Sequence, residues 1–172
     1  MKKILETDRL FLRKFVREDD TALFEIFVDG GMPQMLQTGF LDIDSVRSFL
    51  NRMFELYAKN DFGLWAVIEK ETGKLIGYCG VHEIKLNETE DKVELAYRIY
   101  KKVWGKGLAT EAATAVLTYA FAVLKLPEIV CCIAHDNDRS MRVAEKVGLV
   151  YWKDGTFKSK PCRVYRTMKG LL

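Results

Sequence analysis

Two spacings of hydrophobic residues run along this chain and divide it into strands and helices. Apolar residues that alternate with polar ones, or stand in short unbroken runs, predict β-strands, whereas an i, i+3, i+4, i+7 spacing predicts amphipathic helices. The predicted strands are 10–15, 64–69, 75–84, 92–100, 128–134, 149–153 and 163–169. The predicted helices are 17–29, a helix from Asp44 with apolar residues through Tyr57, 108–124 and 140–147. The resulting order βααβββαβαββ predicts one α/β domain, and the run 128–134, apolar on both faces, is expected in the middle of its sheet.

Polar residues and glycines mark the boundaries of these elements. Asp44 is the predicted N-cap of the second helix, and Gly30-Gly31 ends the first. Gly77 and Gly80 lie inside a predicted strand, where they indicate a bulge or the close approach of another backbone. Gly155 is the predicted turn between the last two strands.

Composition narrows the class of protein. With 172 residues, 49% of them hydrophobic and 30% charged, the chain fits one globular domain. A net charge of +3 argues against a dedicated nucleic-acid-binding protein and is compatible with an anionic cofactor. The four cysteines form no Cys-x-x-Cys pair and only two histidines are present, so we expect neither a metal site nor a disulfide framework. Nothing resembles a secretory signal or approaches 18 consecutive apolar residues, so we expect a cytoplasmic protein that does not enter a membrane.

The most informative stretch is Trp104-Gly105-Lys106-Gly107-Leu108-Ala109-Thr110-Glu111-Ala112, between a predicted strand and a long predicted helix. Its two glycines let the backbone approach a ligand closely. The unpaired N–H groups and the dipole of the helix start attract an anion, so the segment favours a phosphate or pyrophosphate. A tight strand-to-helix turn without a ligand is the alternative.

A second segment, His135 to Leu149, contains Asn137, Ser140 and Glu145-Lys146-Val147-Gly148. Together with the glycine-rich segment it resembles the GNAT superfamily of acetyl-CoA-dependent N-acetyltransferases. The opening Glu6-Thr7-Asp8-Arg9-Leu10 is similar to that of the ribosomal-protein N-terminal acetyltransferase branch, and the resemblance runs from about residue 7 to residue 168. It implies a mixed, mostly antiparallel sheet splayed in the middle. It also implies acetyl transfer to a primary amine, on a protein N-terminus or a small molecule, and a homodimer is common among such relatives.

The same resemblance implies which residues bind the cofactor. Backbone groups of Ile99 and Tyr100 would polarise the thioester carbonyl and pair with the pantetheine arm, and Asn137 would contact that arm. Arg139, Arg142 and Lys146 are candidates for the 3′-phosphate, although a solvated helix face is the better explanation of any one of them. The full set of expected acetyl-CoA contacts is Ile99, Tyr100, Trp104, Gly105, Lys106, Gly107, Leu108, Ala109, Thr110, Asn137 and Ser140.

For catalysis the candidates are Glu94, Tyr97 and Ser140. Glu94 could remove the amine proton, or be a surface carboxylate paired with a lysine such as Lys92. Tyr97 shares a sheet face with Ile99 and could line the acceptor site or simply pack in the core. The resemblance implies that Ser140 protonates or stabilises the leaving thiolate, whereas a helix N-cap is the structural alternative.

Two departures from the family pattern bear on catalysis. Ala144 stands where the wider family often carries a catalytic tyrosine, and Trp104 replaces a glutamine or arginine. The pair His82-Glu83 could face the acceptor, although a lone surface histidine is the more common case. The loops 30–40 and 155–161, which would shape that side, carry no motif that identifies the amine.

Three other readings compete with this one. A dinucleotide-binding fingerprint would follow its strand at once, but the residues from Tyr100 to Trp104 intervene, and no Gly-Lys-Ser/Thr of a P-loop is present. The remaining alternative is a relative that binds acyl-CoA without catalysis, as a sensor or assembly component.

Overall fold

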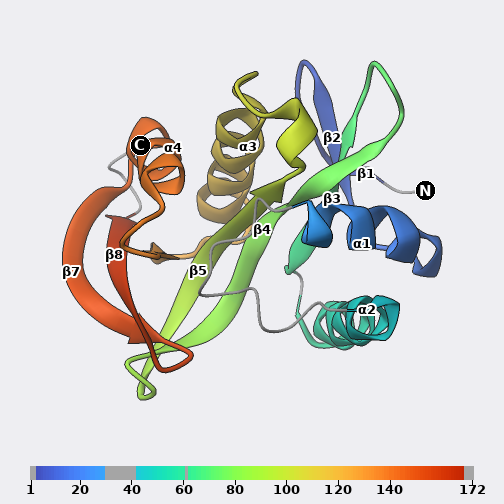
Figure 1. Cartoon of the computed structure of the whole chain (residues 1–172). Coiled ribbons are helices and arrows are strands. Elements are labelled where there is room, and N and C mark those ends of the chain that lie inside the picture. Colours follow the sequence, from blue (N-terminus) through green and yellow to red (C-terminus); the bar gives the residue numbers. More distant parts are fainter. Residues whose placement is uncertain (1–2, 30–41, 61, 169–172) are drawn as a thin grey trace.

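The computed structural model describes residues 3–29, 42–60 and 62–168, and its framework is one eight-stranded sheet (Figure 1). The strands lie in the order β1-β2-β3-β4-β5-β6-β8-β7, and all neighbours are antiparallel except β5 and β6. Their bounds are β1 Lys3–Glu6, β2 Leu10–Arg13, β3 Leu64–Glu69, β4 Leu75–Leu86, β5 Glu90–Ile99, β6 Glu128–Ile133, β7 Val150–Phe157 and β8 Lys160–Met168. The mixed, mostly antiparallel sheet is therefore confirmed, and β6 lies inside it as predicted.

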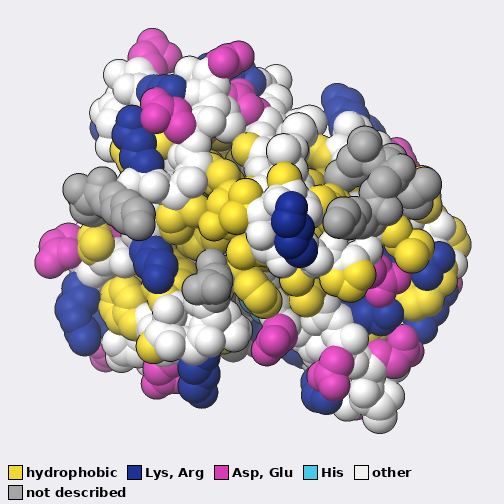
Figure 2. All heavy atoms as spheres, turned by 180° about the vertical axis from the view of Figure 1, so that it is seen from behind, with side chains coloured by type: hydrophobic (Ala, Val, Ile, Leu, Met, Phe, Trp, Pro, Cys, Tyr) yellow, Lys and Arg dark blue, Asp and Glu magenta, His cyan; other side chains and the backbone are white. Residues whose placement is uncertain are grey.

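Helices cover both faces of the sheet. Successive side chains of β3 point to opposite faces and pack against different helices. Trp65 and Val67 pack with α3 (Leu108–Ala122) and α4 (Asp138–Lys146) in one apolar core. Ala66 and Ile68, which point the other way, pack with α1 (Asp20–Val28) and α2 (Ile43–Lys59) in a second. On the side of the molecule in Figure 2, hydrophobic side chains gather near the centre, and most of the charged ones lie around them. Within the described residues, none of the helices is long and apolar enough to cross a bilayer.

The predicted order lacked the first strand. Lys3–Glu6 pairs with β2 along the edge of the sheet, so the order is ββααβββαβαββ. This strand holds only four residues, and its two apolar ones, Ile4 and Leu5, are adjacent rather than alternating. Its pattern therefore gave no periodic signal. The first helix is also divided, because a 3-10 turn, η1 (Arg17–Asp19), precedes α1.

The predicted N-cap of α2 was wrong. Asp42, not Asp44, caps the helix, and its carboxylate accepts the N–H of Ser45 at 2.8 Å. Asp44 lies in the first turn and pairs with Arg47 at 3.3 Å. Two aspartates two residues apart are equally good caps by type, and only the backbone decides between them. The predicted stop at Gly30-Gly31 lies outside the described residues.

The predicted turn at Gly155 was also wrong. Strand β7 continues through Gly155, which pairs with Cys162, and the chain turns at Lys158 and Ser159, where φ is 50° and 59°. A side chain at Gly155 would begin 3.1 Å from the Asn87 oxygen and 3.3 Å from Leu86. Glycine stands here because another part of the chain lies close to it, not because the chain reverses direction.

The prediction for Gly77 and Gly80 is confirmed. A Cβ at Gly77 would lie 2.0 Å from the Arg98 carbonyl oxygen on β5, and one at Gly80 would lie 2.0 Å from the Gly63 carbonyl oxygen. The register between β3 and β4 also shifts between Val67 and Ile68, beside Gly77. Both glycines therefore allow neighbouring backbones to approach β4 closely.

Candidate functional site

Strands β5 and β6 diverge and leave a wedge in the middle of the sheet. They share one registered pair, Glu94 with Val130, although both strands continue beyond it. A cavity of about 1220 Å³ occupies this region, and side chains from both faces of the sheet line it, among them Ala96 on one face and Tyr97 on the other. The predicted splay is thus present, and a ligand in it can be reached from two sides.

At the end of β5 one backbone N–H is directed at the wedge. The N–H of Tyr100 donates to the Ile76 carbonyl on β4 at 2.7 Å. Successive residues of an antiparallel ladder face opposite ways, so Ile99, which is paired with Gly77, directs its backbone groups toward β6. The indole of Trp104 donates to the Ile99 carbonyl at 2.7 Å, and the guanidinium of Arg139 lies 4.6 Å from the centre of the indole ring.

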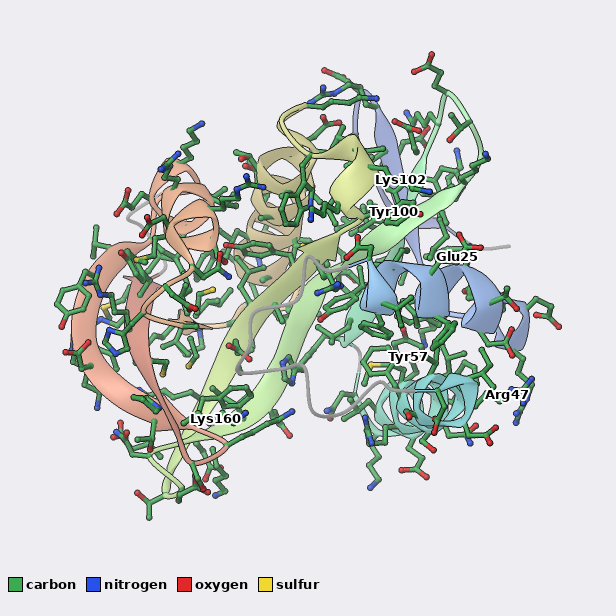
Figure 3. All side chains as sticks on the ribbon, in the orientation of Figure 1. Glu25, Arg47, Tyr57, Tyr100, Lys102 and Lys160 are labelled. Carbon is green, nitrogen blue, oxygen red and sulfur yellow. The ribbon has the colours of Figure 1, made fainter. Side chains whose placement is uncertain are left out.

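Tyr100 is therefore not part of this wedge. Its N–H bonds to β4, and its side chain lies beside Lys102 and near Glu25 of α1 (Figure 3), in a separate shallow hollow. The side chain of Lys106 is not among those lining the large cavity either, and its carbonyl accepts a hydrogen bond from Arg9. The other predicted cofactor contacts, and Arg139, Arg142 and Lys146, all line it.

The glycine-rich turn ends in a left-handed residue that starts α3. Gly107 has φ of 75° and ψ of 8° and is the residue before the helix, and Gly105 has φ of 82°. A Cβ at Gly105 would meet nothing within 4 Å, and one at Gly107 would meet only Arg9, at 3.8 Å. The turn is therefore open to the cavity. In the first turn of the helix the N–H groups of Leu108 to Thr110 have no carbonyl partner within the helix.

A hydrogen-bond cluster attaches this turn to the N-terminus of the chain. The Glu111 carboxylate accepts from the Thr7 hydroxyl at 2.6 Å and from the Arg9 N–H at 2.9 Å. The Arg9 guanidinium donates to Glu111 at 2.6 Å and to the Lys106 carbonyl at 2.8 Å. The sequence showed Thr7 and Arg9 only as a family signature, and their physical role is to fix the glycine-rich turn.

We expect this cluster to weaken in acid. Burial alone would raise the pKa of Glu111, but hydrogen bonds from Thr7 and Arg9 outweigh it and hold the pKa below 4.5. A lowered folded-state pKa contributes stability above the unfolded value, and this stability is lost as the pH falls through the folded value. Glu111→Gln should therefore lose less thermal stability than the parent between pH 5.5 and pH 3.5, as measured by the melting temperature. Equal losses in the two proteins would contradict the expectation.

Glu94 is buried in the wedge and is not a surface carboxylate. One oxygen accepts the Cys132 N–H from β6 at 3.0 Å, and the other lies 3.1 Å from Nε2 of His82 on β4. Its side chain is 7% exposed. Lys92, the expected partner of a surface Glu94, pairs with Glu128 instead, at 2.7 Å. The carboxylate thus replaces part of the missing ladder between β5 and β6.

Ser140 and Tyr97 meet on the other side of the wedge. The Tyr97 hydroxyl lies 2.9 Å from the Ser140 hydroxyl and 2.9 Å from the Ser140 carbonyl. Burial raises the pKa of Tyr97 well above its usual value, so the phenol keeps its proton. Ser140 is not the N-cap of α4: Asn137 caps the helix, and its side-chain oxygen accepts the Ser140 N–H at 3.1 Å. The Ser140 hydroxyl is therefore not used as a cap.

Comparison with known proteins agrees with this geometry. Residues 9–150 match the family described as Acetyltransferase (GNAT) domain. The chain belongs to the GNAT acetyltransferase family. YoaA of Bacillus subtilis (strain 168), described as an uncharacterized N-acetyltransferase, is 30% identical over 158 residues, which are 90% of this chain and 86% of YoaA.

Solved structures share the fold over nearly the whole chain. The acetyltransferase from Agrobacterium tumefaciens str. C58 superposes with a TM-score of 0.79 at 27% identity, over 97% of this chain and 94% of that one. A ribosomal L7/L12 alpha-N-protein acetyltransferase in complex with coenzyme A gives 0.81 at 13% identity, over 97% and 98%. The second likeness concerns the fold alone.

As a GNAT protein, the chain is an N-acetyltransferase, but its α4 lacks the tyrosine that other members often carry. Ala144 at that position is fully buried against the core. A phenol still reaches this region, because Tyr97 extends from β5 to the start of α4. Among residues 3–29, 42–60 and 62–168, no cluster of three or more His, Cys, Asp and Glu side chains could hold a metal ion.

Proposed function

We propose that this protein transfers an acetyl group directly from acetyl-CoA to a primary amine, on a protein N-terminus or a small molecule. The observation that carries the proposal is the wedge between β5 and β6, with the Ile99 N–H directed into it and the open turn at Gly105 and Gly107 beside it. A thioester is already activated, so the protein has to align the two substrates, polarise the carbonyl and move protons.

The residues of the turn and wedge fit acetyl-CoA. A pyrophosphate would lie against the N–H groups of Leu108, Ala109 and Thr110, where the helix dipole also favours negative charge. The Ile99 N–H would donate to the thioester carbonyl, and Asn137, beside the wedge, would contact the pantetheine arm. Since Arg139 lies against Trp104, the exposed Arg142 and Lys146 are the better candidates for the 3′-phosphate.

The two sides of the sheet would divide the proton transfers. Glu94 and Ala96 share the face that packs toward α1 and α2, so an amine reaching this face meets Glu94 and its partner His82. Tyr97 and Ser140 lie on the face of α3 and α4. The Tyr97 hydroxyl donates to the Ser140 carbonyl and lies 2.9 Å from Ser140 Oγ, so it would hold the serine where its hydroxyl proton can be given to the leaving sulfur. The amine proton is removed on one side, and the thiolate is protonated on the other.

Ser140→Ala should lower kcat about tenfold or more with little change in KM for acetyl-CoA, because only a transition-state interaction is lost. Tyr97→Phe should show a smaller effect in the same direction. Steady-state kinetics with acetyl-CoA varied would measure both. Ser159→Ala is the control, since Ser159 lies in the exposed turn between β7 and β8 and its hydroxyl bonds to Glu88, away from the wedge. An unchanged kcat in Ser140→Ala would remove the serine from the mechanism.

Calorimetry followed by turnover tests the proposal as a whole. Acetyl-CoA should bind, CoA should bind more weakly, and NAD should not bind. Thiol release should then appear with spermidine or with peptides that carry a free N-terminus. Binding of NAD in place of acetyl-CoA would refute the proposal, and binding without any turnover would favour the non-catalytic acyl-CoA-binding alternative.

A further inference from the structure

The buried carboxylate of Glu94 holds His82 in one orientation. Both partners of Glu94 are N–H donors: the Cys132 backbone on one oxygen and the His82 ring on the other. A carboxylate only accepts, so Nε2 of His82 must carry the hydrogen, and in the neutral ring the lone pair is then on Nδ1. Among the described residues, none forms a hydrogen bond with Nδ1.

His82 is also the more accessible of the two groups. Its side chain is 21% exposed, against 7% for Glu94, and both line the large cavity. The strands place them side by side, since His82 and Glu94 are directly paired between β4 and β5. An amine in the cavity therefore meets the imidazole before it meets the carboxylate.

We propose that His82 is the catalytic base of the acetyl transfer and that Glu94 is its positioning residue. The inference rests on the proposed function. Nδ1 takes one proton from the acceptor ammonium, which leaves a neutral amine and an imidazolium stabilised by Glu94. The amine lone pair forms the C–N bond, the C–S bond breaks, and sulfur leaves with its electron pair. The sulfur takes the Ser140 hydroxyl proton, the second amine proton replaces it on the serine, and the imidazolium returns its proton to solvent.

Other titratable groups line the same cavity, among them Arg98 of β5 and, in the turns that follow β4 and β7, Glu88 and Lys158. Cys132 of β6 adjoins Glu94, and on the far side of the cavity α2 contributes Arg52, Glu55 and Lys59. On β4 itself Glu83 and Lys85 follow, and Lys85 pairs with Asp91 at 2.6 Å. Of the groups named, only Glu94 forms a hydrogen bond with the His82 ring.

Because the chain has only two histidines, NMR of the imidazole nitrogens tests the positioning directly. In the parent protein at neutral pH, His82 should be the tautomer with hydrogen on Nε2. The amide of Glu94→Gln has one acceptor oxygen for two N–H donors, so this variant should shift the His82 signals or change the tautomer. Exposed His135 should be unaffected. Hydrogen on Nδ1 in the parent, or unchanged His82 signals in Glu94→Gln, would overturn the proposal.

Kinetics test the catalytic role, with spermidine and a peptide with a free N-terminus as acceptors. His82→Gln should lower kcat/KM about 100-fold and remove the acidic limb of its pH profile, as loss of a general base does. Glu94→Gln should lower kcat/KM less than His82→Gln does, and it should shift the acidic limb of the pH profile. A Glu94 that only stabilised the fold would not shift this limb. His135→Gln is the matched control.

Activity of His82→Gln within twofold of the parent would overturn the catalytic role. A parent that binds acetyl-CoA but acetylates neither acceptor would refute the proposed function and the catalytic role with it. The NMR result would still decide whether Glu94 positions His82.

Discussion

Gly107→Val is expected to weaken the binding of acetyl-CoA at least about 100-fold. Gly107 has φ of 75° immediately before α3, at the point where we expect the pyrophosphate to meet the helix start. A branched side chain there would project into the open space where we expect the ligand, since the nearest described atom to its first carbon, on Arg9, is 3.8 Å away. It would also shield the N–H groups of the first turn from the anion.

Strain alone could weaken binding, because a β-branched residue at positive φ costs stability anywhere. Gly73→Val separates the two effects. Gly73 has φ of 66° and lies in the turn between β3 and β4, where a Cβ would meet nothing within 4 Å, but it does not line the cavity. Both variants should lose similar stability, and only Gly107→Val should lose binding in calorimetry. If it keeps the parent's affinity, the phosphates bind elsewhere.

Gly80→Ala is expected to lower the free energy of unfolding by about 3 kcal/mol, at the upper end of the cost of adding a group to a packed site. The new carbon would lie 2.0 Å from the Gly63 carbonyl oxygen and 2.7 Å from the Leu64 Cα. Both are backbone atoms next to and within β3, so no side-chain rotation can relieve the overlap. Strands β3 and β4 would have to separate near the centre of the sheet.

Chemical denaturation would measure this loss, and Gly73→Ala provides the comparison. It adds the same methyl group where nothing lies within 4 Å, so it should cost only the strain of a positive φ, about 1 kcal/mol. Equal losses in the two variants would mean that β4 can move away from β3 without cost.

Hydrophobic periodicity predicted the parts of the fold in which burial decides the structure. Strand β3 was predicted to the residue at 64–69, because all six of its residues are buried and it reads as one apolar run between polar turns. The helix α2 was predicted because Val46, Phe49, Leu50 and Met53 are buried at helical spacing. Where an element buries few side chains, as Lys3–Glu6 does, the hydrophobic pattern predicted no strand.

The sequence predicted which residues form the candidate site, but not which residues they contact. The wedge residues Glu94, Tyr97 and Ser140 were identified, yet their contacts join residues between 12 and 43 positions apart and depend on the strand register. The register also decides that the Tyr100 N–H bonds to β4 while that of Ile99 faces the wedge. No local pattern in the sequence carries that information.

The link between Arg9 and Glu111 joins residues 102 positions apart, so the glycine-rich turn is completed only after the N-terminal segment has docked. Bringing these two residues together costs conformational entropy, and this cost is already included in the free energy of the folded state. Binding of a ligand at the turn and docking of the N-terminal strands are therefore thermodynamically linked, and each favours the other. The amide exchange rates of residues 3–10, at the edge of the sheet and far along the chain from the cavity, should therefore depend on whether the turn is occupied.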